Sequence, residues 1–235
     1  MASSSWNLQP SVWIDRTCNP IREVVDQIKR PENPVKEMIP LALGDPTVFG
    51  NFHSPEVLKN AIETNLRTER FNGYCPSTGR PEARAAIATF YQTPTSPLTP
   101  DDVIITSGGS GALEIAMKAL LNPGDNVLLP QPGFALYQTI AEHYGSKCKF
   151  YNLTPETGWE CDLKQLESLI DSRTKCILIN NPSNPCGSVF SKTHLEAILA
   201  IADRHKVPII SDEIYAHMCF TGSTFHHVAS LTSTV

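Results

Sequence analysis

From about residue 102 onward, short apolar runs alternate with longer segments in which apolar residues recur every three or four positions. Short apolar runs are typical of buried strands, and the spacing of the longer segments is typical of amphipathic helices. Strand–helix alternation predicts a mostly parallel sheet covered by helices on both faces, a three-layer α/β/α fold. The predicted strands are 103–106, 126–130, 148–153, 175–179 and 207–211.

Residues typical of helix starts mark several of the predicted helices. Ser54 is expected to be the N-cap of a helix with Pro55 at its first position, and Asp162 is expected to cap another. Thr193 and Glu196 have the spacing of a capping box. Residues 1–48 show little periodicity and suggest an N-terminal arm with one short strand at 38–43. Helices are predicted at 54–65, 79–92, 110–121, 134–145, 162–170 and 193–205.

The composition excludes several classes of protein. A net charge of −5 with no basic cluster argues against nucleic acid as a partner. Seven cysteines are an odd number, and none forms a Cys-x-x-Cys pair, which argues against a disulfide framework or a zinc site and favours a reducing compartment. No apolar run approaches the ~20 residues needed to cross a bilayer, and the first ten residues lack the pattern of a secretory signal. We expect a cytoplasmic protein with no membrane contact, with mitochondria as the alternative.

The residues that follow the predicted strands carry the candidate chemistry, because ligands of open parallel sheets bind beyond the carboxyl ends of the strands. The segment "TSGGSGALE" (106–114) places Gly108, Gly109 and Ser110 ahead of a helix, where free N–H groups can bind a phosphate. A tight turn that needs glycine is the alternative. The segment is a poor dinucleotide fingerprint, since Glu114 stands where a third glycine belongs.

Two further segments offer polar side chains at the same edge. In "NNPSNPCG" (180–187) Asn184 could present its amide to a ligand, or the segment could be only a proline-rich turn. Asp212 follows a strand directly and could face a cationic ring nitrogen, or simply cap a helix. Tyr215 lies three residues later. A phosphate seat, an amide and a phenol for a hydroxyl, and a carboxylate for a pyridinium together describe one ligand, pyridoxal 5′-phosphate.

An ordered set of segments resembles a known family. They are "NPIR" (19–22), "LGDPT" (43–47), "NGYCPSTG" (72–79), "PQPGFALY" (130–137), "YNLTPETGWECDLKQLESLID" (151–171), "NNPSNPCGSVFSK" (180–192) and "SDEIY" (211–215). With these the chain resembles the fold-type I pyridoxal-phosphate-dependent aminotransferases, most closely the tyrosine type. The resemblance implies transamination of an aromatic amino acid with 2-oxoglutarate by a homodimer. It also implies an arm and part of the small domain at 1–72 and a cofactor-binding large domain at 73–235.

The resemblance implies roles for individual residues. Gly109 and Ser110, with Gly108 in the same turn, would hold the cofactor phosphate, and Phe134 would stack on the pyridine ring. Asn184 and Tyr215 would hold the phenolate oxygen of the ring, and Asp212 its nitrogen. These cofactor-binding roles follow from motif positions alone.

Two further roles concern the substrate and the neighbouring subunit. Tyr74 would reach the phosphate of the neighbouring subunit, and the backbone at Gly44 would touch the substrate carboxylate. Read without the resemblance, Phe134, Tyr74 and Gly44 are an ordinary packing residue, a turn tyrosine and a turn glycine.

One part of the family pattern is missing. The lysine that forms a Schiff base with the cofactor belongs to a segment well downstream of "DEIY", and the last lysine of this chain is Lys206. Lys192 follows a serine, as the catalytic lysine of the family does, but it lies at the start of a predicted helix. A solvated charge is expected there. The catalytic lysine is thus expected beyond Val235, and the large domain is expected to be incomplete at its C-terminus. We therefore expect a truncated chain with little or no activity.

Three alternatives remain open. Other fold-type I enzymes, such as alanine-type aminotransferases, carbon–sulfur lyases and aminocyclopropane-carboxylate synthases, would share most of these site residues. A truncated chain could also act as a non-catalytic isoform that pairs with a full-length subunit. A nicotinamide-binding domain is disfavoured by the missing third glycine and the missing ribose-binding acid.

Overall fold

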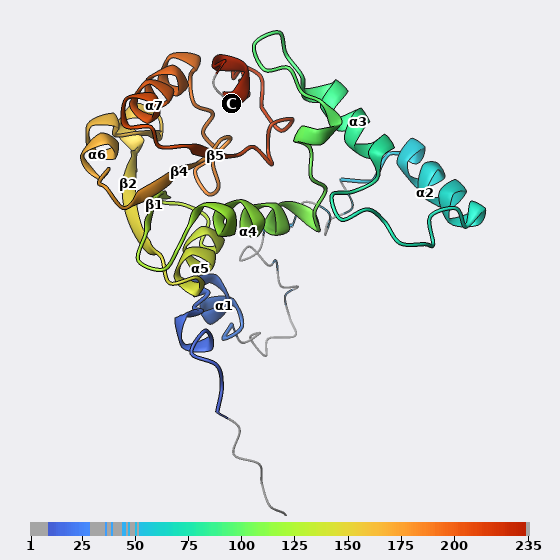
Figure 1. The fold of residues 1–235 in the computed structure, drawn as a ribbon, viewed down its shortest axis with the longest axis horizontal. Coiled ribbons are helices and arrows are strands. Elements are labelled where there is room, and N and C mark those ends of the chain that lie inside the picture. Colours follow the sequence, from blue (N-terminus) through green and yellow to red (C-terminus); the bar gives the residue numbers. More distant parts are fainter. Residues whose placement is uncertain are drawn as a thin grey trace, which may run out of the picture.

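The computed structural model describes residues 9–28, 36, 39, 44–45, 47, 50 and 52–233, and it contains one five-stranded sheet. The strand order is β3-β2-β1-β4-β5, and every neighbouring pair is parallel except β2 and β3. Figure 1 shows the sheet within the part of the chain that carries helices α4 to α7. The strands are β1 (Asn126–Gln131), β2 (Lys147–Thr154), β3 (Glu160–Cys161), β4 (Thr174–Asn180) and β5 (Ile209–Asp212).

Helices cover both faces of this sheet, which confirms the predicted three-layer α/β/α architecture (Figure 1). Helices α4 and α5 pack on one face, and α6 and α7 pack on the other. The described residues also form short 3₁₀ helices: η1 (Ile14–Arg16), η2 (Pro100–Asp102), η3 (Pro155–Thr157) and η4 (Val228–Leu231). The α-helices are α1 (Pro20–Val25), α2 (Glu56–Thr68), α3 (Pro81–Tyr91), α4 (Gly108–Leu120), α5 (Leu136–His143), α6 (Leu163–Ser168) and α7 (Lys192–His205).

Alternate residues of the central strands supply the two cores. On strand β4 the side chains of Ile177 and Ile179 enter the core beneath α6 and α7, while Cys176 and Leu178 enter the core beneath α4 and α5. All four are fully buried, because a strand covered on both faces alternates its side chains between two apolar layers. This is why the sequence of β4 is apolar at consecutive positions.

The prediction of a buried strand at 103–106 is wrong. No described strand pairs with this segment, and Ile104 and Ile105 are 56% and 38% exposed. Its backbone is bonded to the region around α3 instead: the Ile105 N–H donates to the Thr78 carbonyl, and Arg84 Nε donates to the Val103 carbonyl. An apolar run specifies a strand only where a neighbouring strand offers a ladder, and periodicity alone does not reveal that neighbour.

Helix starts agree with the sequence only in part. Asp162 caps α6 as predicted, since its side chain accepts hydrogen bonds from the N–H groups of Lys164 and Gln165. The predicted caps at Ser54 and Thr193 are each displaced. Helix α2 has Pro55 at its N-cap position, and Ser191 caps α7 by accepting from the His194 N–H. An N-cap side chain accepts from the N–H two or three residues after it, at the start of the helix. Ser191 directly precedes α7 and meets this condition, whereas Thr193 already lies inside the helix.

Several predictions about the first 72 residues stay predictions. The strand expected at 38–43 lies, except for Ile39, outside the described residues, and nothing in the described contacts tests the domain boundary near residue 72. Within the described residues 9–28, Thr17 and Cys18 contact α5: Thr17 Oγ1 lies 2.8 Å from His143 Nδ1, and Thr139 Oγ1 donates to the Cys18 carbonyl. In the described part of the chain, no helix has the length and apolarity that a membrane span requires.

Replacing the cap of α6 should weaken the fold. We expect Asp162→Ala to lower the free energy of unfolding by about 1 kcal/mol, because two N–H groups of the first turn lose their acceptor. Urea denaturation followed by circular dichroism measures this change. Asp203→Ala is the control, because Asp203 forms only an exposed pair with Lys206 and should cost less than about 0.5 kcal/mol. Equal losses in both variants would contradict the assigned cap.

Candidate functional site

The carboxyl ends of β4 and β5 are bound to each other by a hydrogen-bonded set of asparagine groups. Asn180 Nδ2 and the backbone N–H of Asn181 both donate to the carbonyl of Asp212, each at 3.1 Å. Asn180 Oδ1 accepts from the backbone N–H of Asn184 at 2.6 Å. A single nearly buried side chain, that of Asn180, therefore connects the 180–187 loop to the residue that ends β5.

The Asp212 carboxylate is held from two sides. Its Oδ2 accepts from the hydroxyl of Tyr137 at 2.7 Å, and its Oδ1 accepts from the backbone N–H of Ile214 at 3.2 Å. Burial, followed by the nearby charge and hydrogen bond of Asp212 and by Tyr215, raises the pKa of Tyr137 far above that of a free phenol. Tyr137 thus stays protonated and donates, which fixes the direction in which the carboxylate points.

This carboxylate keeps acceptor capacity for a ligand. A carboxylate offers about four lone-pair positions, of which the contacts of Tyr137 and Ile214 use two. Asp212 is only partly buried, and so is Phe134, which packs edge-on against Tyr137 with ring centroids 5.7 Å apart. The arrangement can accept a hydrogen bond from a cationic N–H group beside an aromatic face.

The start of helix α4 faces the segment after β5. A Cβ atom added at Gly109 would lie 4.0 Å from Ile214 Cδ1, two residues beyond Asp212. A Cβ at Gly108 would meet nothing within 4 Å, although the φ of +68° at Gly108 itself favours glycine. The first N–H groups of a helix have no partner within it, and Ser110 adds an exposed hydroxyl there. An open, anion-attracting turn therefore lies close to the segment that begins with Asp212.

Two of the predicted site residues have unengaged side-chain polar groups. In the described part of the chain, the amide of Asn184 and the hydroxyl of Tyr215 form no hydrogen bond to another residue, and both residues are partly buried. Tyr215 also contributes to the raised pKa of Tyr137, the residue whose hydroxyl bonds to Asp212. Asn184 is one hydrogen bond away from Asn180, which contacts Asp212. These two groups remain available to a ligand.

The remaining two predicted residues are not brought to this edge. Tyr74 is fully exposed in the loop between α2 and α3, and none of its described contacts reaches Asp212. Gly44 is exposed, and no described atom lies within 4 Å of the position its Cβ would take. Lys192 opens α7 with its amine 3.7 Å from Glu196, so the solvated charge expected for it is confirmed.

Sequence reasoning missed two members of the site. Tyr137 lies in a segment of the family pattern without a predicted role of its own, and Asn180 is predicted only as the first residue of a proline-rich turn. A signal existed for Asn180, because it is the last residue of β4 and pairs in register with Asp212, the last residue of β5. For Tyr137 there was none, since its hydroxyl meets Asp212 only through the packing of α5 on the sheet.

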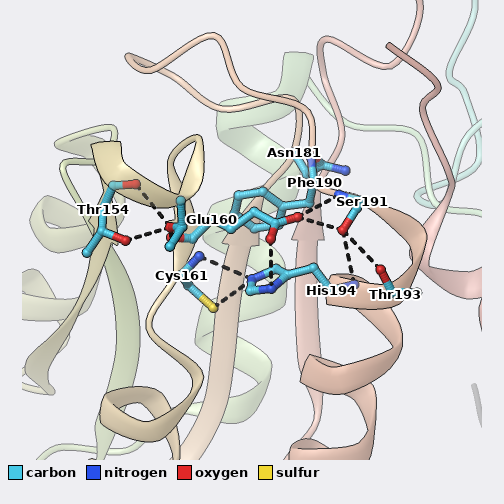
Figure 2. Close-up of polar contacts among 9 residues, drawn as sticks. Thr154, Glu160, Cys161, Asn181, Phe190, Ser191, Thr193 and His194 are labelled. Atoms are coloured by element: carbon cyan, nitrogen blue, oxygen red, sulfur yellow. Dashed lines mark hydrogen bonds and ion pairs between the residues drawn. The ribbon is translucent and has the colours of Figure 1, made fainter.

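A second group of reactive side chains lies between β3 and the start of α7, as Figure 2 shows. Cys161 Sγ is 3.2 Å from His194 Nε2, and His194 Nδ1 is 3.4 Å from Glu160 Oε2. The other oxygen of Glu160 accepts from both the backbone N–H and the hydroxyl of Ser191. The order cysteine, histidine, carboxylate is that of a cysteine nucleophile with its base.

The surroundings of this group show that it is structural. The backbone N–H of Cys161 donates to His194 Nε2, so this nitrogen accepts and the proton of the ring sits on Nδ1, facing Glu160. Burial raises the pKa of Cys161 to about 12, and burial also lowers the pKa of His194 against the opposing charge of Glu160. Both residues are less than a tenth exposed. The group fastens β3 to α7, and no group of three or more His, Cys, Asp or Glu among the described residues is arranged to hold a metal.

The chain is similar to proteins of one family. The family model described as aminotransferase class I and II matches residues 36–234. Tyrosine aminotransferase of Bos taurus is 52% identical over 98% of this chain and 52% of its own length. The crystal structure of tyrosine aminotransferase from Leishmania infantum superposes with a TM-score of 0.87 at 37% identity, over 96% of this chain and 60% of that one. Alanine aminotransferase from Pyrococcus furiosus gives 0.84 at 35% identity, over 95% and 55%.

The bound proton of Tyr137 should appear in the pH dependence of stability. Folding raises the pKa of Tyr137 above its unfolded value near 10, so the folded chain binds more protons above that pH and its unfolding free energy falls as pH rises. We expect Tyr137→Phe to make this fall less steep by up to about 1.4 kcal/mol per pH unit between roughly pH 10 and 11. Urea denaturation at several pH values measures the slope. Tyr74→Phe removes an exposed hydroxyl and is the control; identical slopes in wild type and Tyr137→Phe would contradict the assignment.

The structural role of Cys161 predicts low thiol reactivity. We expect iodoacetamide at about pH 8 to label the exposed Cys75 in the folded chain and to leave Cys161 unlabelled until urea unfolds it, because the buried thiol keeps its proton. Mass spectrometry of the peptides gives the extent of labelling at each cysteine. Labelling of Cys161 as fast as that of Cys75 would show an accessible thiolate and contradict this interpretation.

Proposed function

Because the chain belongs to the family of class I and II aminotransferases, we propose that its sheet edge binds pyridoxal 5′-phosphate and serves transamination between an aromatic amino acid of the L-tyrosine class and 2-oxoglutarate. The chain spans about half the length of the curated relatives it matches. The activity, substrates and partners of the whole protein are therefore part of the proposal.

The observation that carries the proposal is the approach of the first turn of α4, at Gly109, to Ile214 in the segment that begins with Asp212. Asp212 presents a held carboxylate with free acceptor positions, and the turn at Gly108 and Gly109 offers open space at a helix N-terminus. A cofactor with a pyridinium at one end and a phosphate at the other needs these two groups on opposite sides of one site. The residues present thus fit pyridoxal 5′-phosphate.

Each residue of the edge would act on a particular part of the bound molecule. Asp212 would accept the N–H of the ring nitrogen and keep it protonated, with Tyr137 holding the carboxylate in place. Asn184 and Tyr215 would donate to the phenolate oxygen, and the first turn of α4, with Ser110, would bind the phosphate. When bound, the cofactor supplies a ring that withdraws electrons from the α-carbon of an amino acid. Phe134 would cover one face of the ring.

The preference for an aromatic substrate has the support of sequence similarity. Identities of 50–52% are found with mammalian tyrosine aminotransferases, while the tyrosine and alanine aminotransferase structures differ little, at 37% and 35%. Tyrosine catabolism is the pathway in which we propose that this reaction takes part.

We also propose that the 235-residue chain by itself binds the cofactor without a covalent link. Support comes from the sequence, in which Lys206 is the last lysine and precedes β5. Among the described residues Lys192 and Lys206 pair with Glu196 and Asp203, so neither is placed to move a proton at this edge. The alternative is that this chain acts as a non-catalytic partner by pairing with a full-length subunit.

A homodimer of the full-length form is the proposed assembly. Helix α2 exposes large apolar side chains along its length, including Val57 (77% exposed), Ile62 (60%) and Leu66 (72%). Exposed apolar side chains grouped on one element favour a protein interface. Tyr74 follows the same helix and is fully exposed, as a residue that reaches the neighbouring site would have to be.

Substitution of Asp212 tests the proposed site. We expect the purified chain to bind pyridoxal 5′-phosphate, and Asp212→Asn to weaken binding about tenfold to a hundredfold, because a charge-assisted hydrogen bond to the ring nitrogen is lost. Equilibrium dialysis at pH 7 with absorbance detection measures the dissociation constant. Borohydride reduction should leave no pyridoxyl group on any one lysine.

The control variant removes an aspartate carboxylate that lies outside the proposed site. Asp203→Asn loses an exposed ion pair on α7 and should bind as tightly as the wild type. Equal affinity of Asp212→Asn and wild type would overturn the proposed role of Asp212, and specific labelling of a single lysine would overturn the proposed non-covalent binding.

A further inference from the structure

Glu213, the residue after Asp212, points its carboxylate to a partner that the proposed cofactor site does not use. Its Oε2 is within hydrogen-bonding distance of His227 Nδ1, and its Oε1 accepts from the Val228 N–H and the Ser211 hydroxyl, each at 2.9 Å. A carboxylate only accepts, so His227 Nδ1 carries the proton and donates. One side chain thus joins the end of β5 to the segment 225–231.

The segment 225–231 is itself firmly held. Val228 is 6% exposed and belongs to the core beneath α6 and α7, and Leu231 packs against the same core. Thr95 Oγ1 donates to the Ser230 carbonyl at 2.9 Å. The bond to Glu213 therefore connects the end of β5 to a fixed support.

Two aromatic rings hold the imidazole of His227 in position. The edge-to-face partners are Phe225, at 4.8 Å between ring centroids, and Tyr91 of α3, at 5.4 Å. The side chains of Glu213 and His227 are 20% and 32% exposed, so the pair is partly shielded from water. Its geometry is restricted more than that of a surface pair.

We infer that Glu213 and His227 form a positioning pair that restrains the backbone carrying Asp212, so that the carboxylate held by Tyr137 faces the ring nitrogen of the cofactor; the inference rests on the proposed function. Asp212 and Glu213 are consecutive, and Asp212 bonds to Tyr137 on the side of α4 and α5 while Glu213 bonds on the side of α6 and α7. The short turn that starts at Glu213 is closed by the Ala216 N–H donating to the Glu213 carbonyl. Fixing Glu213 thereby restricts the backbone on which Asp212 is mounted. Neither Glu213 nor His227 touches the reacting atoms.

The test compares two ligands that differ only at the ring nitrogen. One is pyridoxal 5′-phosphate, and the other is its deaza analogue, in which a benzene ring replaces the pyridine and all other groups are kept. His227→Phe keeps a ring between Tyr91 and Phe225 and removes the Nδ1 donor. We expect it to raise the dissociation constant of pyridoxal 5′-phosphate about tenfold and to leave that of the analogue unchanged, because only the pyridine can report on Asp212.

Matched variants separate positioning from loss of structure. His227→Asn has an amide nitrogen at the place of Nδ1 and should restore most of the affinity. Thr95→Val removes a different hydrogen bond to the same segment and should change neither dissociation constant. Glu213→Gln combined with His227→Phe should lose no more affinity than His227→Phe alone, as expected for residues that act as one unit.

The outcomes distinguish this inference from the proposed function. If wild type binds pyridoxal 5′-phosphate, Asp212→Asn weakens it, and His227→Phe binds like wild type, the positioning pair is refuted while the cofactor site stands. If His227→Phe weakens both ligands equally, the pair is only structural and the inference is again refuted. Failure of the wild-type chain to bind pyridoxal 5′-phosphate refutes the proposed function and the inference with it.

Discussion

The site depends on one constraint, the alignment of the last residues of β4 and β5. Asn180 and Asp212 are paired in register, and the Asn180 amide and the Asn181 N–H both bond to the Asp212 carbonyl. These two hydrogen bonds hold the backbone of Asp212 independently of the contacts of its side chain. The 180–187 loop then bonds to Asn180, so two candidate ligand-binding segments take their positions from a single pair of strand ends.

The end of β5 and the residue after it connect the two cores through consecutive side chains. Asp212 and Glu213 bond on opposite faces of the sheet, to Tyr137 and His227 respectively. The partners come from regions far apart in the chain, since Tyr137 precedes Asp212 by 75 residues and His227 follows Glu213 by 14. The position of one carboxylate is therefore determined by packing on both faces, and substitutions in either core can be transmitted to it.

Sequence patterns predicted the parts of this protein that local chemistry decides. Strands β1, β2, β4 and β5 and the cap at Asp162 follow from apolar runs and from a side chain that bonds to its own helix. The run 103–106 looked equally like a strand but lacks a neighbouring strand, a condition that no local pattern encodes. The candidate residues near Asp212 were predictable because parallel strands present their ends at one edge, whereas Tyr137 and the His227 support depend on long-range packing. Asp162 and Asp212 show the difference, since the first meets its partners within three residues and the second needs partners from α5 and β4.

The outer side of β5 is open in the described part of the chain. Among the described strands β5 pairs with β4 alone, so the backbone groups on its other side have no ladder partner there. Unpaired N–H and C=O groups along an edge strand can bond to a further extended segment. The sheet can therefore extend by another strand on this side, directly beside the end of β5 that carries Asp212.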